Sequence, residues 1–294
     1  MDFSSVTNAV SDLSNKVRLD GTPAEEEPEE DQLIEFVTEE ELYGAIPEPL
    51  PANKVLPDWY KKLGQYTEGN GELGSTNERN GVARSTVKRC APFMEAMTMG
   101  FIVPLCGEVY FDAEDGYVQY EWDFQRELIS PHSLSQVGGE MFPNHEWPVL
   151  KFINHWSIKV PDGYSVLVTN PMNRPGQPFT PFSGIVDVDS YFNNINAPFM
   201  WTGGDFEGVV PQGSPIIQVI PFHRDTMLTD ATSRPMTEEE DMEIRRTKNE
   251  ISAHQSMYRD NRWQHKQGSR MLPPEAVESG EDESEGSSCP FHRN

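Results

Sequence analysis

Cysteine is scarce in this chain of 294 residues, which has three: Cys90, Cys106 and Cys289. An odd number without a framework spacing argues against disulfides, so we expect reduced thiols in a soluble, cytoplasmic protein that is not secreted. Paired Cys-x-x-Cys and His-x-His patterns are missing, so we expect no metal site.

No apolar run approaches the roughly 18 residues of a membrane span, and residues 1–20 lack the pattern of a secretory leader.

Basic residues are also few, since 23 Lys and Arg stand against 48 Asp and Glu, which gives a formal net charge of -25. Ten acids and no Lys or Arg lie between Glu25 and Glu41, and six more acids lie between Glu275 and Glu285. Most of the surplus charge is therefore confined to two segments. Because phosphate backbones need a basic face, we expect no direct binding of nucleic acid.

Proline and glycine are abundant, at 24 and 22 residues, which disfavours long helices through the middle of the chain. Short β-branched runs between turn residues instead predict strands. They are clearest at 151–160, 164–169, 183–189 and 213–222, with a hairpin at 108–122, a further strand at 86–90 and one helical turn at 92–98. We expect a mainly β fold, a single antiparallel sandwich or jelly-roll-like domain over residues 85–225.

The flanking segments have different compositions. Residues 1–44 predict a flexible acidic segment, residues 45–84 a Pro-rich arm and loop, and residues 268–294 a disordered acidic tail. Residues 236–267 predict a C-terminal helix that starts at a capping box, Thr237 to Glu240. Its apolar residues Ile244, Ile251 and Tyr258 are seven apart, a thin stripe that suits docking on the β-domain or on a partner.

The clearest chemical candidate lies at residues 184–191, where two carboxylates follow a glycine. Asp187 and Asp189 are two residues apart, so on a strand their side chains point the same way. Such a pair can orient a water molecule or hold a divalent cation. The alternative is that both residues cap a turn at the end of a strand.

A loop between strands supplies further candidates. Residues 170–174 combine fixed backbone with polar donors, and Asn170, Asn173 and Arg174 could bind an anion or a base edge. The alternative is a rigid turn without a ligand. Downstream, Gln218 is the one amide in an apolar strand; it could bind a ligand, or it could satisfy a buried backbone group.

The order of several short motifs over residues 45–225 resembles an uncharacterised family of tailed phages, notably of marine bacteria, and of bacteria. The motifs are Trp59, residues 89–93, Gly100, residues 122–124, residues 161–165, residues 170–171, residues 184–187 and residues 213–216. This resemblance implies a phage-encoded protein that acts in the cytoplasm of the host cell. It implies no particular activity.

A second resemblance is to the dUTPase and dCTP deaminase superfamily, over residues 184–220. Residues 184–191 resemble its Gly-Val-Ile-Asp-x-Asp-Tyr motif, and residues 213–220 resemble its Gly-x-Arg-Ile-Ala-Gln-Leu-Ile motif. The resemblance implies that Asp187 activates the attacking water and that Tyr191 stacks on the deoxyribose, with Mg²⁺ as cofactor. Residues 170–174 replace the phosphate-binding motif of that family, and Pro215 stands where it has an arginine.

Two hypotheses follow. The first, which we favour because no complete catalytic set is visible, is a non-enzymatic phage-type interaction or assembly protein without a cofactor. It would contact a protein partner through its N-terminal arm and C-terminal helix, and could also form homo-oligomers. The second is a dUTPase-like nucleotide-binding or nucleotide-hydrolysing protein with Asp187 as the water-activating residue.

Overall fold

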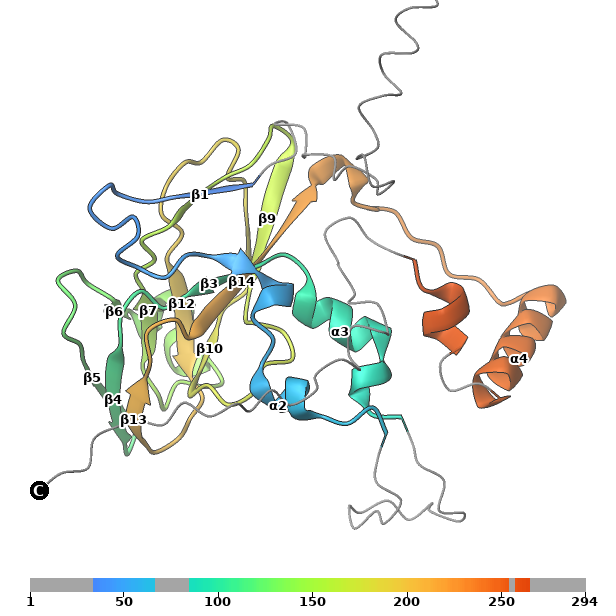
Figure 1. Ribbon diagram of the computed structural model, residues 1–294, viewed down its shortest axis with the longest axis horizontal. Helices are drawn as coiled ribbons and strands as arrows, with labels where there is room; N and C mark the ends of the chain where they lie inside the picture. Colours follow the sequence, from blue (N-terminus) through green and yellow to red (C-terminus); the bar gives the residue numbers. More distant parts are fainter. Residues whose placement is uncertain (1–33, 67–84, 254–256, 265–294) are drawn as a thin grey trace, which may run out of the picture.

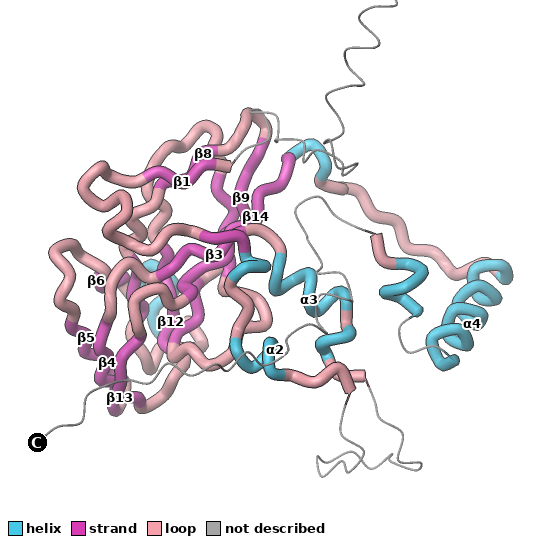
Figure 2. Tube along the Cα trace, viewed as in Figure 1, coloured by secondary structure: helices cyan, strands magenta, loops and turns pink. Residues whose placement is uncertain are grey.

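The part of the protein that the structure describes is mainly β, with four antiparallel sheets (Figures 1 and 2). The computed structural model describes residues 34–66, 85–253 and 257–264. The acidic tail predicted at 268–294 and most of the acidic segment predicted at 1–44 lie outside these residues. Within the described residues, no helix is long and apolar enough to cross a membrane.

The five-stranded sheet carries Gln218, and the other candidate residues lie in the segments that follow two of its strands. Its strand order is β11-β9-β14-β3-β2, namely Gly184–Val186, Tyr164–Thr169, Pro215–His223, Phe101–Pro104 and Leu50–Pro51. The four-stranded sheet has the order β10-β12-β7-β6, namely Phe179–Pro181, Ala197–Trp201, Val149–Phe152 and Ile129–His132. The three-stranded sheet is β13-β4-β5, namely Phe206–Val210, Val109–Glu114 and Tyr117–Glu121, and the two-stranded sheet pairs β1, Glu35–Val37, with β8, Ser157–Lys159.

The inner faces of the sheets share one hydrophobic core, which confirms the predicted mainly β, sandwich-like class. Phe152 of β7 stacks on Phe199 of β12 with ring centroids 4.1 Å apart. Trp201 of β12 packs on Phe111 of β4 with ring centroids 5.2 Å apart, which ties the three-stranded sheet to the same core. Val219 of β14 belongs to this cluster too, so the central strand of the five-stranded sheet is anchored from one side.

The predicted hairpin forms from β4 and β5, and its turn is tighter than the sequence suggests. Glu114 pairs with Tyr117, so only Asp115 and Gly116 make the turn. Both have positive φ, 50° and 82°, which is the conformation of two-residue hairpin turns. β4 buries every second side chain, as expected for a strand with one face on the core.

Helices occur at the margins of the sheets. They are α2 Asp58–Lys62, α3 Ala91–Thr98 and α4 Glu238–Ala253, with short helices η3 Ala52–Lys54, η4 Val87–Arg89, η5 Leu134–Val137, η6 Gly139–Met141, η7 Arg224–Thr226 and the π-helical turn η8 Tyr258–Arg262. The helical turn predicted at 92–98 is confirmed as α3. The strand predicted at 86–90 is wrong, because the hydroxyl of Thr86 accepts a hydrogen bond from the Lys88 N–H and starts η4 instead.

The chain approaches the five-stranded sheet closely at Gly100, two residues after the end of helix α3. Gly100 has φ of +67°, and a Cβ atom there would collide with the backbone of Val219. Only glycine combines this conformation with this contact. The glycine therefore sets how α3 lies against β14.

The core extends on the N-terminal side beyond the boundary predicted at residue 85. Leu42 and Ile46 are buried in the main cluster. β2 pairs with β3, and the Trp156 indole N–H donates to the Pro47 carbonyl at 3.1 Å. Part of the predicted Pro-rich arm is thus packed into the fold, through contacts with residues 50 to 109 positions away.

Helix α4 begins at the predicted capping box. The Thr237 N–H donates to the Glu240 carboxylate at 2.8 Å, and the Glu240 N–H donates to the Thr237 hydroxyl at 3.3 Å. Arg234 adds a two-pronged hydrogen bond to Glu240, and this bond lowers the pKa of the Glu240 carboxyl to about 2. The described residues of the helix predicted over 236–267 form α4 and the turn η8.

Candidate functional site

The side chain of Gln218 joins three segments that are distant in the sequence. It is fully buried in β14, directly opposite Thr169 at the end of β9. Its carbonyl oxygen accepts the Met172 N–H at 2.9 Å. Its amide nitrogen donates to the carbonyls of Ala96 at 3.0 Å and Met99 at 2.6 Å, so both N–H bonds are used within the protein. Of the two roles left open for Gln218, the structure shows the satisfaction of buried backbone groups.

The candidate loop that follows β9 is also held by hydrogen bonds from side chains to backbone carbonyls. Asn173 has a positive φ of 57°, and its side-chain amide donates to the Phe93 carbonyl in α3 at 3.0 Å. Arg174 donates to the carbonyls of Val55, Ala52 and Met97, the last two at 3.1 and 3.2 Å. Its burial lowers the pKa of the guanidinium to about 10. Asn170 is half-buried at the start of the loop. The guanidinium of Arg174 therefore donates to backbone carbonyls, whereas binding a ligand would require it to face solvent.

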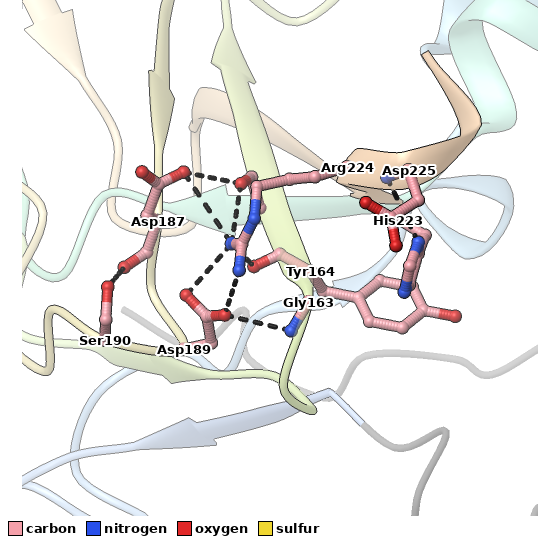
Figure 3. Close-up of polar contacts among 9 residues, drawn as sticks. Gly163, Tyr164, Asp187, Asp189, Ser190, His223, Arg224 and Asp225 are labelled. Carbon is pink, nitrogen blue, oxygen red and sulfur yellow. Dashed lines mark hydrogen bonds and ion pairs between the residues drawn. The ribbon is translucent and has the colours of Figure 1, made fainter.

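The carboxylate of Asp189 forms the strongest ionic contact near the end of the five-stranded sheet (Figure 3). Arg224, one residue beyond β14, donates to both its oxygens, at 3.0 and 2.5 Å. The Gly163 N–H adds a third hydrogen bond at 3.0 Å. The Asp189 side chain is 7% exposed. The hydrogen bonds from Arg224 hold the pKa of the Asp189 carboxyl well below its usual value.

Asp187 has a more open environment (Figure 3). Its side chain is 61% exposed, and its carboxylate accepts the Ser165 hydroxyl at 2.6 Å and lies 3.8 Å from Arg224. Its backbone carbonyl accepts the N–H groups of Ser190 and Tyr191 at 3.2 and 2.9 Å, which closes a turn directly after β11. The side chain of Tyr191 is 53% exposed. Asp187 thus combines a structural turn with an accessible carboxylate.

The structure separates the candidate residues into two groups. Asp187, Asp189 and Tyr191 lie on one turn, whereas Asn170, Asn173, Arg174 and Gln218 lie at the opposite end of the β9–β14 pairing. Ser165 is opposite Phe222 and Thr169 is opposite Gln218, so the two ends are four residues apart along a strand. At about 3.3 Å per residue, that is roughly 13 Å. The two groups do not converge on one ligand-sized site.

Two residues of the acidic group, Arg224 and Ser165, were not among the candidates that the sequence provided. Both are brought beside Asp187 by the antiparallel register of β9 with β11 and β14. Their contacts span 22 to 59 residues of sequence, so no local motif could have signalled them.

The carboxylates of Asp187 and Asp189 already lie beside a cation, the guanidinium of Arg224. Arg224 binds both oxygens of Asp189 and lies near Asp187, so a divalent ion at this pair would have to displace a guanidinium. Among the described residues, no three His, Cys, Asp or Glu side chains are grouped as a metal would require. Of the cysteines there, Cys90 is exposed and Cys106 is buried, and burial raises the pKa of the Cys106 thiol to about 11.

The fold and this site define a mainly β protein with a buried amide anchor and a half-exposed acidic turn. Neither models of known protein families nor curated protein sequences gave a match to this chain. The two resemblances described above therefore remain hypotheses, and function has to be argued from the geometry.

Replacing Gln218 by leucine should lower the free energy of unfolding by about 2–4 kcal/mol, because the Met172 N–H and the carbonyls of Ala96 and Met99 lose their partner. Chemical denaturation measures this. The matched control is Gln212→Leu, since Gln212 is exposed and donates only to the Cys106 carbonyl, and there we expect a loss of about 0.5 kcal/mol or less. Equal losses for the two variants would contradict the assigned role of Gln218.

Acid should remove the stabilisation that Asp189 provides. Because the pKa of its carboxyl is lower in the folded protein than in the unfolded chain, the contribution is complete above about pH 4 and disappears as pH falls through the folded value. The stability of the Asp189→Asn variant should therefore approach that of the wild type between pH 4 and pH 2, measured by denaturation at each pH. The Arg224→Gln variant should lose stability at a higher pH than the wild type, because the pKa of the Asp189 carboxyl in the folded protein is no longer held down by the guanidinium. Parallel pH profiles for all three proteins would refute this.

Proposed function

We propose that this chain is a non-enzymatic interaction or assembly protein of the kind that tailed phages encode. The observation that carries the proposal is the C-terminal arm, which we define as residues 227–253 and 257–264. Large apolar side chains are exposed along it at Met227, Leu228, Met236, Met242, Ile244, Ile251 and Tyr258. Leu228 is 97% exposed, and no residue of the 16-residue helix α4 is buried.

Met257 of this arm is buried, but helix α4 buries no side chain and gains little from the core of its own chain. Most helices in proteins are stabilised by packing an apolar face, and isolated helices of this length are marginal in water. Grouped exposed apolar residues mark contact surfaces in soluble proteins. The exposed arm therefore supports a role in binding another protein surface.

Local contacts keep α4 ready for such binding. Its capping box and Arg234 fix the first turn, and Arg245 pairs with Asp241 at 2.8 Å. Exposed pairs of this kind contribute little individually, but together they favour the helical state before a partner arrives. A preformed helix loses less conformational entropy on binding than a disordered segment does.

The N-terminal arm supports the proposal less. Leu42 and Ile46 are in the core, and Tyr60 of α2 is buried against Phe93 of α3. Trp59 remains 37% exposed, but its ring also contacts Phe93. Contact with a partner is therefore assigned mainly to the C-terminal arm.

Charging the apolar stripe of α4 should abolish capture of the partner. We expect the double variant Ile244→Asp, Ile251→Asp to retain at most about a tenth of the protein captured by the tagged wild type from extracts of the cells that naturally make it. That corresponds to a loss of at least about 1.4 kcal/mol. Quantitative mass spectrometry measures the captured protein.

The control double variant is Asn249→Asp, Ala253→Asp, which places the same charges on the opposite side of the helix. It should capture the partner as the wild type does. If both double variants and the wild type capture the same proteins in the same amounts, the arm is not the binding element and the proposal fails.

One observation favours the dUTPase-like alternative. Asp187 and Tyr191, the residues to which the resemblance assigns water activation and deoxyribose stacking, are both exposed on one turn, where the Tyr191 N–H donates to the Asp187 carbonyl at 2.9 Å. Under this alternative Asp187, Asp189 and Tyr191 would contact a nucleotide with Mg²⁺, while Arg174 faces inward and contributes no phosphate contact.

The alternative is tested by thermal unfolding with dUTP and the other deoxynucleoside triphosphates in the presence of Mg²⁺. It requires a rise in melting temperature that disappears in Asp187→Asn and persists in Asp112→Asn, a change at an exposed acid in β4. The absence of any rise with any of these nucleotides would contradict it.

A further inference from the structure

One face of the five-stranded sheet is only half covered by the protein itself. Side chains alternate along β14, so Gln218, Ile220 and Phe222 lie on the same face. At Gln218 this face is closed by α3 and the residue after it, since the carbonyls of Ala96 and Met99 accept the amide hydrogen bonds. Toward the end of β14 the side chains of Ile220 and Phe222 are only half-buried.

The uncovered half carries a row of apolar side chains across three strands. Ile220 of β14 is directly opposite Leu167 of β9, and Leu167 is opposite Ile185 of β11. Ile185 is 59% exposed, and β11 has β9 as its only strand partner among the described residues. We call Ile185, Leu167 and Ile220 the open row. It is an apolar strip on the same face that α3 covers elsewhere.

A negative charge borders the open row. Asp187 follows Ile185 by two residues and accepts a hydrogen bond from Ser165, which is opposite Phe222. Its carboxylate is 61% exposed, so it can accept a further cationic partner. The uncovered half of the face is therefore apolar along the row and acidic at its end.

Helix α4 carries a pattern that complements this surface. Ile244 and Ile251 lie two turns apart on one side, 38% and 49% exposed, with Lys248 between them. Arg245 and Arg246 of the same helix form ion pairs with acids of α4. Within the part of the chain that the structure describes, Lys248 forms no ion pair, so its ammonium group is available to Asp187.

The connection between β14 and α4 decides which copy of the row the helix reaches. Residues 227–237 are exposed throughout, and eleven extended residues span at most about 36–40 Å. Ile220 lies only three residues before the end of β14, so docking on its own row would require the connection to reverse the direction of the strand. The connection instead leads α4 away from β9 and β14 (Figure 1).

We propose that α4 of a second copy of this chain docks on the open row. The stripe of Ile244 and Ile251 covers Ile185, Leu167 and Ile220, and Lys248 lies against Asp187. Because each chain has both the helix and the row, reciprocal exchange of arms produces two identical interfaces and a closed dimer with two-fold symmetry. This inference rests on the proposed function and names the partner as the chain itself.

Cysteine cross-linking between two distinguishable copies tests the geometry. In a Cys90→Ser, Cys289→Ser background, one full-length chain carries Ile185→Cys and a differently tagged chain carries Ile251→Cys. Mixing and oxidation should join the two tags in one covalent dimer, seen by non-reducing electrophoresis and mass spectrometry. A partner chain with Ala253→Cys, on the opposite side of α4, should give less than about a tenth of that product.

Two cross-linking results would overturn the inference. One is equal yield with Ile251→Cys and Ala253→Cys. The other comes from a single chain that carries both Ile185→Cys and Ile251→Cys: if its disulfide forms within one chain at high dilution, the helix folds back on its own row.

Charge reversal provides an independent test of the contact between Lys248 and Asp187. Asp187→Lys and Lys248→Asp should each weaken dimerisation, measured by analytical ultracentrifugation, by about tenfold. The variant that combines both changes should recover most of the affinity, with circular dichroism confirming that all three fold. No recovery in the double variant would contradict the assigned contact.

The outcome also separates this inference from the proposed function. A wild-type chain that stays monomeric at all concentrations, while Ile244→Asp, Ile251→Asp still abolishes capture of a different protein, refutes the second copy and leaves the proposed function in place. A monomeric chain whose capture of other proteins is unaffected by that double variant refutes both.

Discussion

The buried amide of Gln218 is the contact on which the arrangement of this protein depends. From the middle of the central strand β14 it binds the loop after β9 through Met172, and it binds α3 through Ala96 and Met99. Because the side chain is fully buried, no water can replace these bonds, and each is worth more than an exposed one. Arg174 and Asn173 reinforce the same closure from the loop. Helix and loop are thereby fixed over one half of the sheet face.

The other half of that face has a different character. Beyond α3 the surface passes from the open row of Ile185, Leu167 and Ile220 to the acidic turn at Asp187 and Asp189. Arg224 neutralises Asp189 and holds the turn against the end of β14, while Asp187 stays accessible. A surface that is apolar in its middle and charged at its border has the composition of a protein contact site. The same chain presents α4, an unpacked helix with a matching stripe, at the end of an exposed connection.

Much of the fold could be predicted from the sequence, because features such as the strand at 164–169 and the capping box at Thr237 are determined by residues that are close together in the sequence. What escaped prediction depends on partners far away in the chain. The place of Leu42 and Ile46 in the core follows from pairings of β1 with β8 and of β2 with β3. A β-branched run at 86–90 became a 3-10 turn through one hydroxyl, that of Thr86. At the candidate site, the residue types were identifiable but their grouping was not, since strand register places Gln218 and Asp187 at opposite ends and brings in Arg224.

Hydrogen exchange as a function of protein concentration tests the central claim most directly, namely that the open half of the sheet face is completed by α4 of another copy. The backbone amides of β11 and of α4 should exchange slowly at high concentration and faster on dilution, with the same midpoint, while those of β3 in the covered half remain unchanged. Exchange in β11 and α4 that is independent of concentration would contradict the claim.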